Sequence, residues 1–141
     1  MTEEKGDNMP IVSIIMPCFN SEQYISDAIQ SVINQTFEDW ELLIADDGST
    51  DRTLDIALSY KNRDKRIQVI SNSHSKGAPG SRNTCLEHST GRYIAFLDSD
   101  DLWLPKKLTL QLEFMTRECI SFAFSYHVVI DENSDYVASY K

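Results

Sequence analysis

Three aspartates follow an apolar run in the stretch IAFLDSDDLWLP, residues 94–105. Carboxylates placed this close together repel one another, so Asp98, Asp100 and Asp101 at the end of a strand favour a bound divalent cation. Because the chain turns there, the first two can both be aimed at a hard ion such as Mg²⁺ or Mn²⁺, which can in turn hold a diphosphate. The alternative is a solvated turn in which one aspartate caps the helix that begins near Leu104.

A second acidic pair, Asp46 and Asp47, closes another apolar run. This is about where a dinucleotide-binding fold places its ribose-binding acid, yet the first turn, PCFNSEQ, contains no glycine to let a pyrophosphate approach the backbone. Asp47 could instead accept the imide hydrogen of a uracil or a ribose hydroxyl, with Phe19 offering an apolar face. The alternative is an Asp-Gly turn with Ser49 or Thr50 capping the next helix.

A guanidinium is the third candidate group. Arg82 follows KGAPG in the first turn of a predicted helix, where it could meet a diphosphate or a pyrimidine edge beside the helix N-terminal amides. The alternative is an ordinary surface arginine. The histidines show no metal-ligand spacing, and the tryptophans and tyrosines are given no role.

The elements that must position these groups alternate in type along the chain. Apolar and β-branched runs predict strands, and apolar stripes at helical spacing predict helices, the first of them capped by Ser21. The strands are predicted at residues 11–17, 40–46, 67–72 and 93–98, with a last candidate in 121–131; the helices are predicted after Ser21, at 53–60, at 81–89 and from Pro105, with Leu104, Leu108, Leu112 and Met115 on one stripe.

This alternation predicts the fold class. Strand–helix–strand units connect by right-handed crossovers, so we expect an α/β fold with a mainly parallel, doubly wound sheet and helices on both faces. Ligands of such sheets lie outside the carboxyl ends of the strands. The stretches PCFN, DDGSTD, KGAPGSRN and DSDD all follow predicted strands, and they are therefore expected to face one crevice.

Composition limits the function classes. The chain has 141 residues, 13 basic and 22 acidic, with a net charge of −9, which disfavours a nucleic-acid partner because that affinity rests on clustered Lys and Arg. Three dispersed cysteines suggest neither a disulfide framework nor a zinc site, and so fit a reducing, cytoplasmic compartment. We expect a polar tail at 1–10 and one domain at 11–141, without a signal peptide or membrane span.

Taken together, VSIIMPCFNSEQYISDAIQSVINQTFEDWELLIADDGSTDRT and GAPGSRNTCLEHSTGRYIAFLDSDDLWLPKKL resemble the nucleotide-binding half of the family 2 glycosyltransferases, the inverting enzymes of the Rossmann-like GT-A fold. The resemblance covers residues 11–112, and its strand-end signatures occur in the family's order and spacing. It implies that Pro17 and Phe19 contact the base and ribose, that Asp47 reads the base and that Arg82 contacts the nucleotide. It also implies a D-x-D motif at Asp98, Ser99 and Asp100, with Asp100 the direct metal ligand and Asp98 near the ribose or metal.

The resemblance also implies an activity. A Mn²⁺- or Mg²⁺-dependent enzyme would transfer sugar with inversion from a nucleotide-sugar donor, with a uridine diphosphate sugar the expected one, to a saccharide or lipid-linked acceptor in polysaccharide or glycolipid synthesis. Peripheral association with the cytoplasmic face of a membrane would fit such acceptors. The family's general base lies well downstream of D-x-D, and nothing in the context of Asp131, Glu132 or Asp135 matches it. The chain is therefore expected to be incomplete at its C-terminus, with the acceptor half largely missing and the catalytic base unknown.

Other readings remain open at this point. IAFLDSDD also looks like the nucleophile motif of haloacid-dehalogenase-type phosphatases, in which Asp98 would become phosphorylated. A binding module could take up a metal–nucleotide complex without turnover. The acidic strand ends could also be plain turns and caps of an interaction domain, although this reading requires several coincidences at once.

Overall fold

The structure is a computed structural model of the chain, and it describes residues 9–131, 133 and 135–140. Most of the polar tail predicted at 1–10 therefore lies outside the described residues. Strands and helices alternate in the order β1 Val12–Cys18, α1 Ile25–Ile33, β2 Trp40–Asp46, α2 Thr53–Lys61, β3 Ile67–Ser71, α3 Ala78–His88, β4 Tyr93–Phe96, α4 Lys107–Arg117, β5 His127–Ile130 and β6 Tyr136–Tyr140.

The central sheet consists of four parallel strands in the order β3-β2-β1-β4. Every residue of β1 and β2 is buried, as expected for inner strands of a parallel sheet that is covered on both faces. Their largely apolar sequences, VSIIMPC and WELLIAD, suit that environment. The predicted α/β class and parallel sheet are confirmed.

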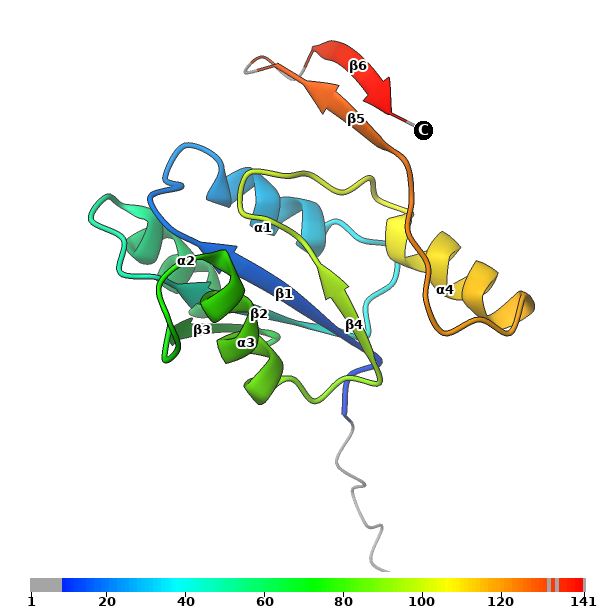
Figure 1. Cartoon of the computed structure of the whole chain (residues 1–141), viewed down its shortest axis with the longest axis horizontal. Helices are drawn as coiled ribbons and strands as arrows, with labels where there is room; N and C mark the ends of the chain where they lie inside the picture. The colour runs from blue at the N-terminus through cyan, green and yellow to red at the C-terminus, as the bar shows by residue number, and fades with distance from the viewer. Residues whose placement is uncertain (1–8, 132, 134, 141) are drawn as a thin grey trace, which may run out of the picture.

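Side chains alternate between the two faces of the sheet, and helices cover each face. On one face, Ile14 and Met16 of β1 pack with the apolar stripe of α1 and with Ala57 of α2 and Leu108 of α4. On the other face, Ile15 and its neighbours in β2 pack against Cys85 of α3, and Figure 1 shows α3 on the opposite side of β1 from α1. The predicted helices on both faces are therefore confirmed.

The strand order reverses beside β1. The chain runs outward from β1 through β2 to β3, and then returns to place β4 on the other side of β1. Such a reversal leaves a crevice at the carboxyl ends of the two strands that flank it. PCFN spans the end of β1 and the start of the following loop, and DSDD lies in the loop after β4, so the two motifs meet at this crevice.

Several local predictions were wrong. Ser21 is not the cap of α1: the helix begins after Tyr24, no side chain caps it, and the Ser21 hydroxyl bonds other groups. Helix α3 begins at Ala78 rather than at residue 81, because Pro79 and Gly80 lie inside its first turn, where proline is well tolerated. Leu104 precedes α4 and is 80% exposed, so it does not belong to the buried stripe of that helix.

The last predicted strand is only partly correct. Within 121–131, only His127–Ile130 forms a strand, and it pairs with β6 as an antiparallel hairpin rather than joining the main sheet. All four side chains of β5 are exposed. Figure 1 shows this hairpin projecting away from the parallel sheet.

Candidate functional site

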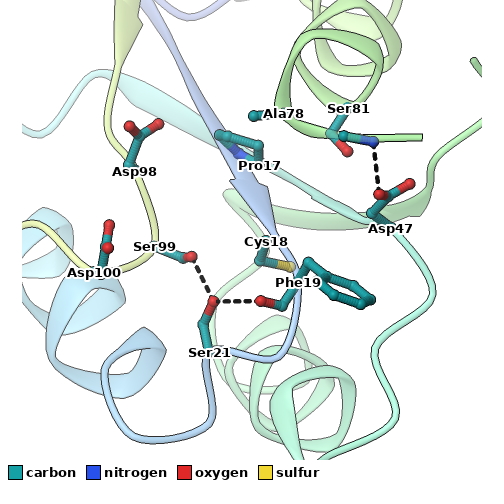
Figure 2. A pocket seen from close by; sticks show the side chains of 11 residues that line it. Pro17, Cys18, Phe19, Ser21, Asp47, Ala78, Ser81, Asp98, Ser99 and Asp100 are labelled. Atoms are coloured by element: carbon teal, nitrogen blue, oxygen red, sulfur yellow. Dashed lines mark hydrogen bonds between the residues drawn. The ribbon is translucent and has the colours of Figure 1, made fainter. Parts of the chain in front are cut away.

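A pocket lies at the carboxyl ends of the strands, between the loops after β1, β2 and β4 and the start of α3 (Figure 2). Its cavity volume of about 320 Å³ is at the lower end of the range for small-molecule sites. The predicted site residues that line it are Pro17, Phe19, Asp47, Asp98, Ser99 and Asp100. Arg82 lines an adjoining hollow together with Phe96, Asp98 and Asp101. The tertiary structure thus gathers the predicted residues from four separate segments.

Asp47 presents its carboxylate to the pocket while two donors hold it. Asn72 Nδ2 donates to Asp47 Oδ1 at 2.7 Å, and the Gly77 amide donates to Asp47 Oδ2 at 2.7 Å. These hydrogen bonds, the one from Asn72 first, hold the pKa of Asp47 below its ordinary value. Each oxygen keeps a second lone pair, so the group is an ionised and oriented acceptor that can still bind a ligand N–H or O–H.

The alternative for Asp47 was that it only forms an Asp-Gly turn, but the neighbouring Asp46 stabilises that turn instead. Asp46 Oδ2 accepts hydrogen bonds from the amides of Gly48 and Ser49, both at 3.1 Å, and Asp46 is 7% exposed. No side chain caps α2 from its N-cap residue, Arg52. Asp46 therefore has the structural role, and Asp47 is left to face the pocket.

The D-x-D turn carries carboxylates in three different environments. Arg82 Nη2 donates to Asp98 Oδ1 at 2.7 Å, so the guanidinium that was predicted to contact a nucleotide is paired with the first aspartate. Asp100 is exposed and accepts no hydrogen bond from the part of the chain that the structure describes. Partial burial, followed by repulsion from Asp100 and Asp98, raises the pKa of Asp101. This crowding of negative charge is the condition that a bound cation relieves.

None of these aspartates caps the following helix. Helix α4 begins after Lys106 without a side-chain cap from that residue, and the Leu108 amide donates to Gln35 Oε1 at 3.1 Å. Gln35 also donates to the Leu104 carbonyl at 2.8 Å, so a side chain from the loop just after α1 fixes the start of α4. The alternative of a capping aspartate is wrong here.

The donor set is compatible with a divalent cation only if the ligand helps to bind it. Among the described residues, no group of three or more His, Cys, Asp or Glu side chains could hold a metal by itself. Mg²⁺ and similar ions are commonly held by one or two carboxylates together with substrate phosphates. Asp100 and Asp98 fit that arrangement, with the remaining positions left to phosphate oxygens and water.

No role in the site was predicted from the sequence for Asn72, Gly77 or Ser21. Asn72 and Gly77 orient Asp47, and Gly77 has a φ of 105°, which favours glycine. Ser21 lines the pocket, and its hydroxyl lies 2.8 Å from that of Ser99. Asn72 could have been found, since it is the last residue of a predicted strand, but the contact of Ser21 with Ser99 spans 78 positions, a separation that no local pattern reveals.

Cys18 also lines the pocket, at the end of β1. Burial, and then the proximity of Asp46, raises the pKa of the Cys18 thiol well above its ordinary value. The thiol therefore stays protonated at neutral pH and is not suited to act as a nucleophile.

Comparison with known proteins identifies related sequences. The family model of glycosyl transferase family 2 matches residues 13–141. A relative from Escherichia coli, the UDP-Glc:alpha-D-GlcNAc-diphosphoundecaprenol beta-1,3-glucosyltransferase WfgD, is 47% identical over 124 residues, which cover 88% of this chain and 48% of that enzyme. The chain thus spans about half the length of such relatives.

Solved structures agree with the sequence matches. Staphylococcus aureus TarS 1-349 in complex with UDP-GlcNAc superposes with a TM-score of 0.69 and 33% identity, over 75% of this chain and 31% of TarS. The mannosyltransferase PcManGT from Pyrobaculum calidifontis in complex with GDP-Man and Mn²⁺ gives a TM-score of 0.63 and 25% identity, over 72% of this chain and 30% of that protein. In the described part of the chain, no helix has the length and apolar character that crossing a bilayer requires.

Proposed function

This chain belongs to glycosyl transferase family 2, and from that membership we propose that it forms the donor-binding part of an enzyme that transfers a sugar from a nucleotide diphosphate to an acceptor hydroxyl. The observation that carries the proposal is the single pocket that joins Asp47 at one side to Asp98 and Asp100 at the other. One group suits the recognition of a base, and the other suits a metal-bound diphosphate. A nucleotide diphosphate has both parts.

The donor that we propose is a uridine diphosphate sugar. The ionised carboxylate of Asp47 can accept the imide hydrogen of uracil, while Phe19, 53% exposed at the rim, offers its ring to the base or ribose beside Pro17. Among the similar structures, the complex of TarS with UDP-GlcNAc supports a uridine donor, whereas PcManGT was solved with GDP-Man.

The second part of the proposal concerns the diphosphate. Asp100 and Asp98 would hold Mn²⁺ or Mg²⁺, and when bound the ion would stabilise the negative charge that develops on the departing diphosphate. Arg82 holds Asp98 through its guanidinium and lies close enough to the crevice to contribute positive charge to the same leaving group. Ser99 lies between the two aspartates in the sequence and lines the same pocket, and we propose that it also contacts the nucleotide sugar.

The reaction that we propose is a single displacement with inversion, in which the acceptor hydroxyl attacks the anomeric carbon as the diphosphate departs. We assign no residue of this chain as the general base. The acceptor is proposed to be a saccharide or lipid-linked saccharide, because the E. coli relative acts on a diphosphoundecaprenol-linked sugar. Such an acceptor would place the enzyme at the cytoplasmic face of a membrane. On this proposal, residues 11–141 are a GT-A nucleotide-sugar-binding domain, and 1–10 are a tail that precedes it.

Calorimetric titration of the purified chain with UDP, in the presence of Mn²⁺ and then of EDTA, tests the proposal. We expect binding that depends on Mn²⁺, with GDP binding more weakly at the same metal concentration. Asp100→Ala is expected to lose the Mn²⁺-dependent part of the binding while the chain stays folded, because the Asp100 side chain is exposed and accepts no hydrogen bond from the described residues.

Asp39→Ala is the matched control. Asp39 is exposed and lies just before β2, at the amino ends of the strands and so away from the pocket at their carboxyl ends, and the variant therefore removes one negative charge without touching the site. Equal UDP affinity with and without Mn²⁺, or unchanged binding in Asp100→Ala, would contradict the proposal.

A second candidate is a module that binds the metal–nucleotide complex without transferring sugar. The share of the relatives' length that the chain spans favours this candidate for the chain on its own. The same titration followed by an assay for sugar transfer separates the two candidates. The phosphatase alternative is disfavoured by the family match, which covers nearly the whole chain.

A further inference from the structure

A chain of hydroxyl groups runs from the D-x-D turn to the loop after β1. Ser99 Oγ lies 2.8 Å from Ser21 Oγ, and Ser21 Oγ donates to the Phe19 carbonyl at 3.2 Å (Figure 2). A serine hydroxyl has one hydrogen, so if Ser21 donates to Phe19, Ser99 must donate to Ser21. Both serines are buried, at 9% and 7% exposure. Removing one of them therefore leaves its buried partner with one hydrogen bond fewer.

Ser21 is itself fixed by a rigid pair of loops. Its amide donates to Thr53 Oγ1 at 2.6 Å, and Thr53, the first residue of α2, is fully buried. Asn20 Oδ1 accepts from the Thr50 amide at 2.8 Å. We call residues 19–22 and 48–53 together the loop platform, because these contacts join the loop after β1 to the loop after β2.

Two further hydrogen bonds close the loop platform reciprocally. The Glu22 amide donates to Asp51 Oδ2 at 3.1 Å, and the Arg52 amide donates to Glu22 Oε2 at 2.9 Å. Such paired bonds satisfy backbone donors near the starts of α1 and α2 without any ligand. The loop platform also holds Phe19 at the base side of the pocket.

The D-x-D turn has few other fixed points. Just after β4, the Leu97 amide donates a hydrogen bond to the Ile15 carbonyl. Within the turn, the Asp101 amide donates to the Asp98 carbonyl at 3.1 Å, and the Arg82 guanidinium donates to the Asp98 carboxylate. Within the described residues, the hydrogen bond of Ser99 to Ser21 is the one that ties the turn 98–101 to the loop platform. This hydrogen bond is made by the residue that separates Asp98 from Asp100, the two proposed metal ligands.

We propose that Ser21 is a positioning residue for the metal ligands: through Ser99 it fixes the D-x-D turn against the loop platform, and so sets the distance between the base side and the diphosphate side of the pocket. The inference rests on the proposed function, since it concerns the same donor. Its physical basis is that a metal bridge needs carboxylates held close to the bound geometry, and outer hydrogen bonds supply that order before the ligand binds.

The test compares Ser21→Ala, Ser99→Ala and the double variant in the full chain. UDP affinity is measured at saturating Mn²⁺ and again in EDTA, and hydrogen exchange of the amides of residues 99–101 is followed without any ligand. The matched control is Ser26→Ala, because Ser26 Oγ forms a similar hydroxyl pair with Tyr60 at 2.9 Å, between α1 and α2 and outside the pocket lining.

We expect each single variant to lose about three- to tenfold in Mn²⁺-dependent UDP affinity, as the loss of one hydrogen bond implies. Affinity in EDTA should stay within about twofold of the parent, and exchange at residues 99–101 should accelerate. The double variant should lose no more than the worse single variant, since both changes break one contact. Ser26→Ala should match the parent in both binding measurements.

Three outcomes would overturn the inference. Variants that bind UDP like the parent at saturating Mn²⁺ would remove the role of Ser21 while leaving the proposed function intact. Equal losses with Mn²⁺ and in EDTA, without faster exchange at 99–101, would show a general structural effect instead. A parent chain without Mn²⁺-dependent UDP binding would overturn the proposed function and this inference together.

Discussion

Asp46 and Asp47 are adjacent in the sequence but face different environments. Asp46 is buried and accepts the amides of the turn that follows it, while Asp47 faces the pocket with its carboxylate held by Asn72 and Gly77. Successive residues at a strand end point in opposite directions, so one can build the turn while the other meets the ligand. The selectivity proposed for the site depends on the second carboxylate alone.

Replacing Asp47 tests that selectivity. Asp47→Asn removes the charge and one acceptor while it keeps the shape of the side chain, and we expect UDP affinity to fall by about tenfold or more, the scale of a charged hydrogen bond. Inorganic diphosphate should compete for the Mn²⁺ site as well as in the parent. Competition titrations measure both affinities, with Asp39→Asn as the control, and a parallel loss of diphosphate binding would contradict the role in base recognition.

The same carboxylate predicts a pH dependence of stability. Because hydrogen bonds lower the pKa of folded Asp47, its contribution to stability is present above the unfolded value of about 3.9 and is lost as pH falls through the folded value. We therefore expect the difference in unfolding free energy between the parent and Asp47→Asn to shrink as pH is lowered from 6 towards 3. Urea denaturation at several pH values measures it, and a constant difference would contradict the prediction.

At the level of elements, the start of α3 supports the loop that orients Asp47. Gly77, whose amide donates a hydrogen bond to Asp47, is the N-cap residue of this helix. Gly80 lies in the first turn and packs directly against the backbone of Ser75. A Cβ built on Gly80 would lie 1.8 Å from the Ser75 carbonyl oxygen. The helix can approach this loop closely because position 80 has no side chain.

Gly80→Ala should therefore affect both stability and binding. Since the clash is with backbone atoms, we expect a loss of about 1–3 kcal/mol in unfolding free energy, typical of overpacking, and weaker UDP binding as residues 75–77 shift. Asn83→Ala, at an exposed position of the same helix, is the control. Thermal and urea unfolding, followed by UDP titration, measure the effect, and stability equal to the parent would show that the loop can move aside at no cost.

At the level of the whole molecule, the parallel sheet and the β5–β6 hairpin differ in how they are held. The inner strands are buried on both faces, whereas every side chain of β5 is exposed and the hairpin stands apart from the body (Figure 1). An isolated two-stranded hairpin is at best marginally stable in water. The hairpin is thus expected to open far more readily than the sheet.

Hydrogen exchange of the whole chain checks this expectation. Amides of β5 that bond to β6 should exchange with little protection, while those of β1 and β2 should exchange only through global unfolding. Mass spectrometry of peptic fragments after deuterium labelling resolves the two regions. Protection of His127–Ile130 comparable to that of the sheet would mean that the hairpin is packed against another surface in solution.

The sequence by itself determined the identity of most elements and the chemistry at their ends. The largely apolar runs of β1 and β2 and the apolar stripe of α1 are local patterns that follow directly from burial, so 40–46 was predicted with the bounds that the structure has. The carboxylates Asp47, Asp98 and Asp100 were found because they lie at or just after the ends of predicted strands, and ligands of open parallel sheets lie at the carboxyl ends of the strands. The family resemblance assigned their roles from the same local motifs.

Only the tertiary structure decided how the carboxyl ends of the strands come together. No local pattern specifies that β4 lies beside β1, yet this placement forms the crevice and brings Ser99 to Ser21, 78 positions apart in the sequence. Ser21 has the residue type of a helix cap, but its hydroxyl is used by that distant partner instead. Hydrogen-bonding side chains take whichever partner packing brings near, and packing depends on the whole fold.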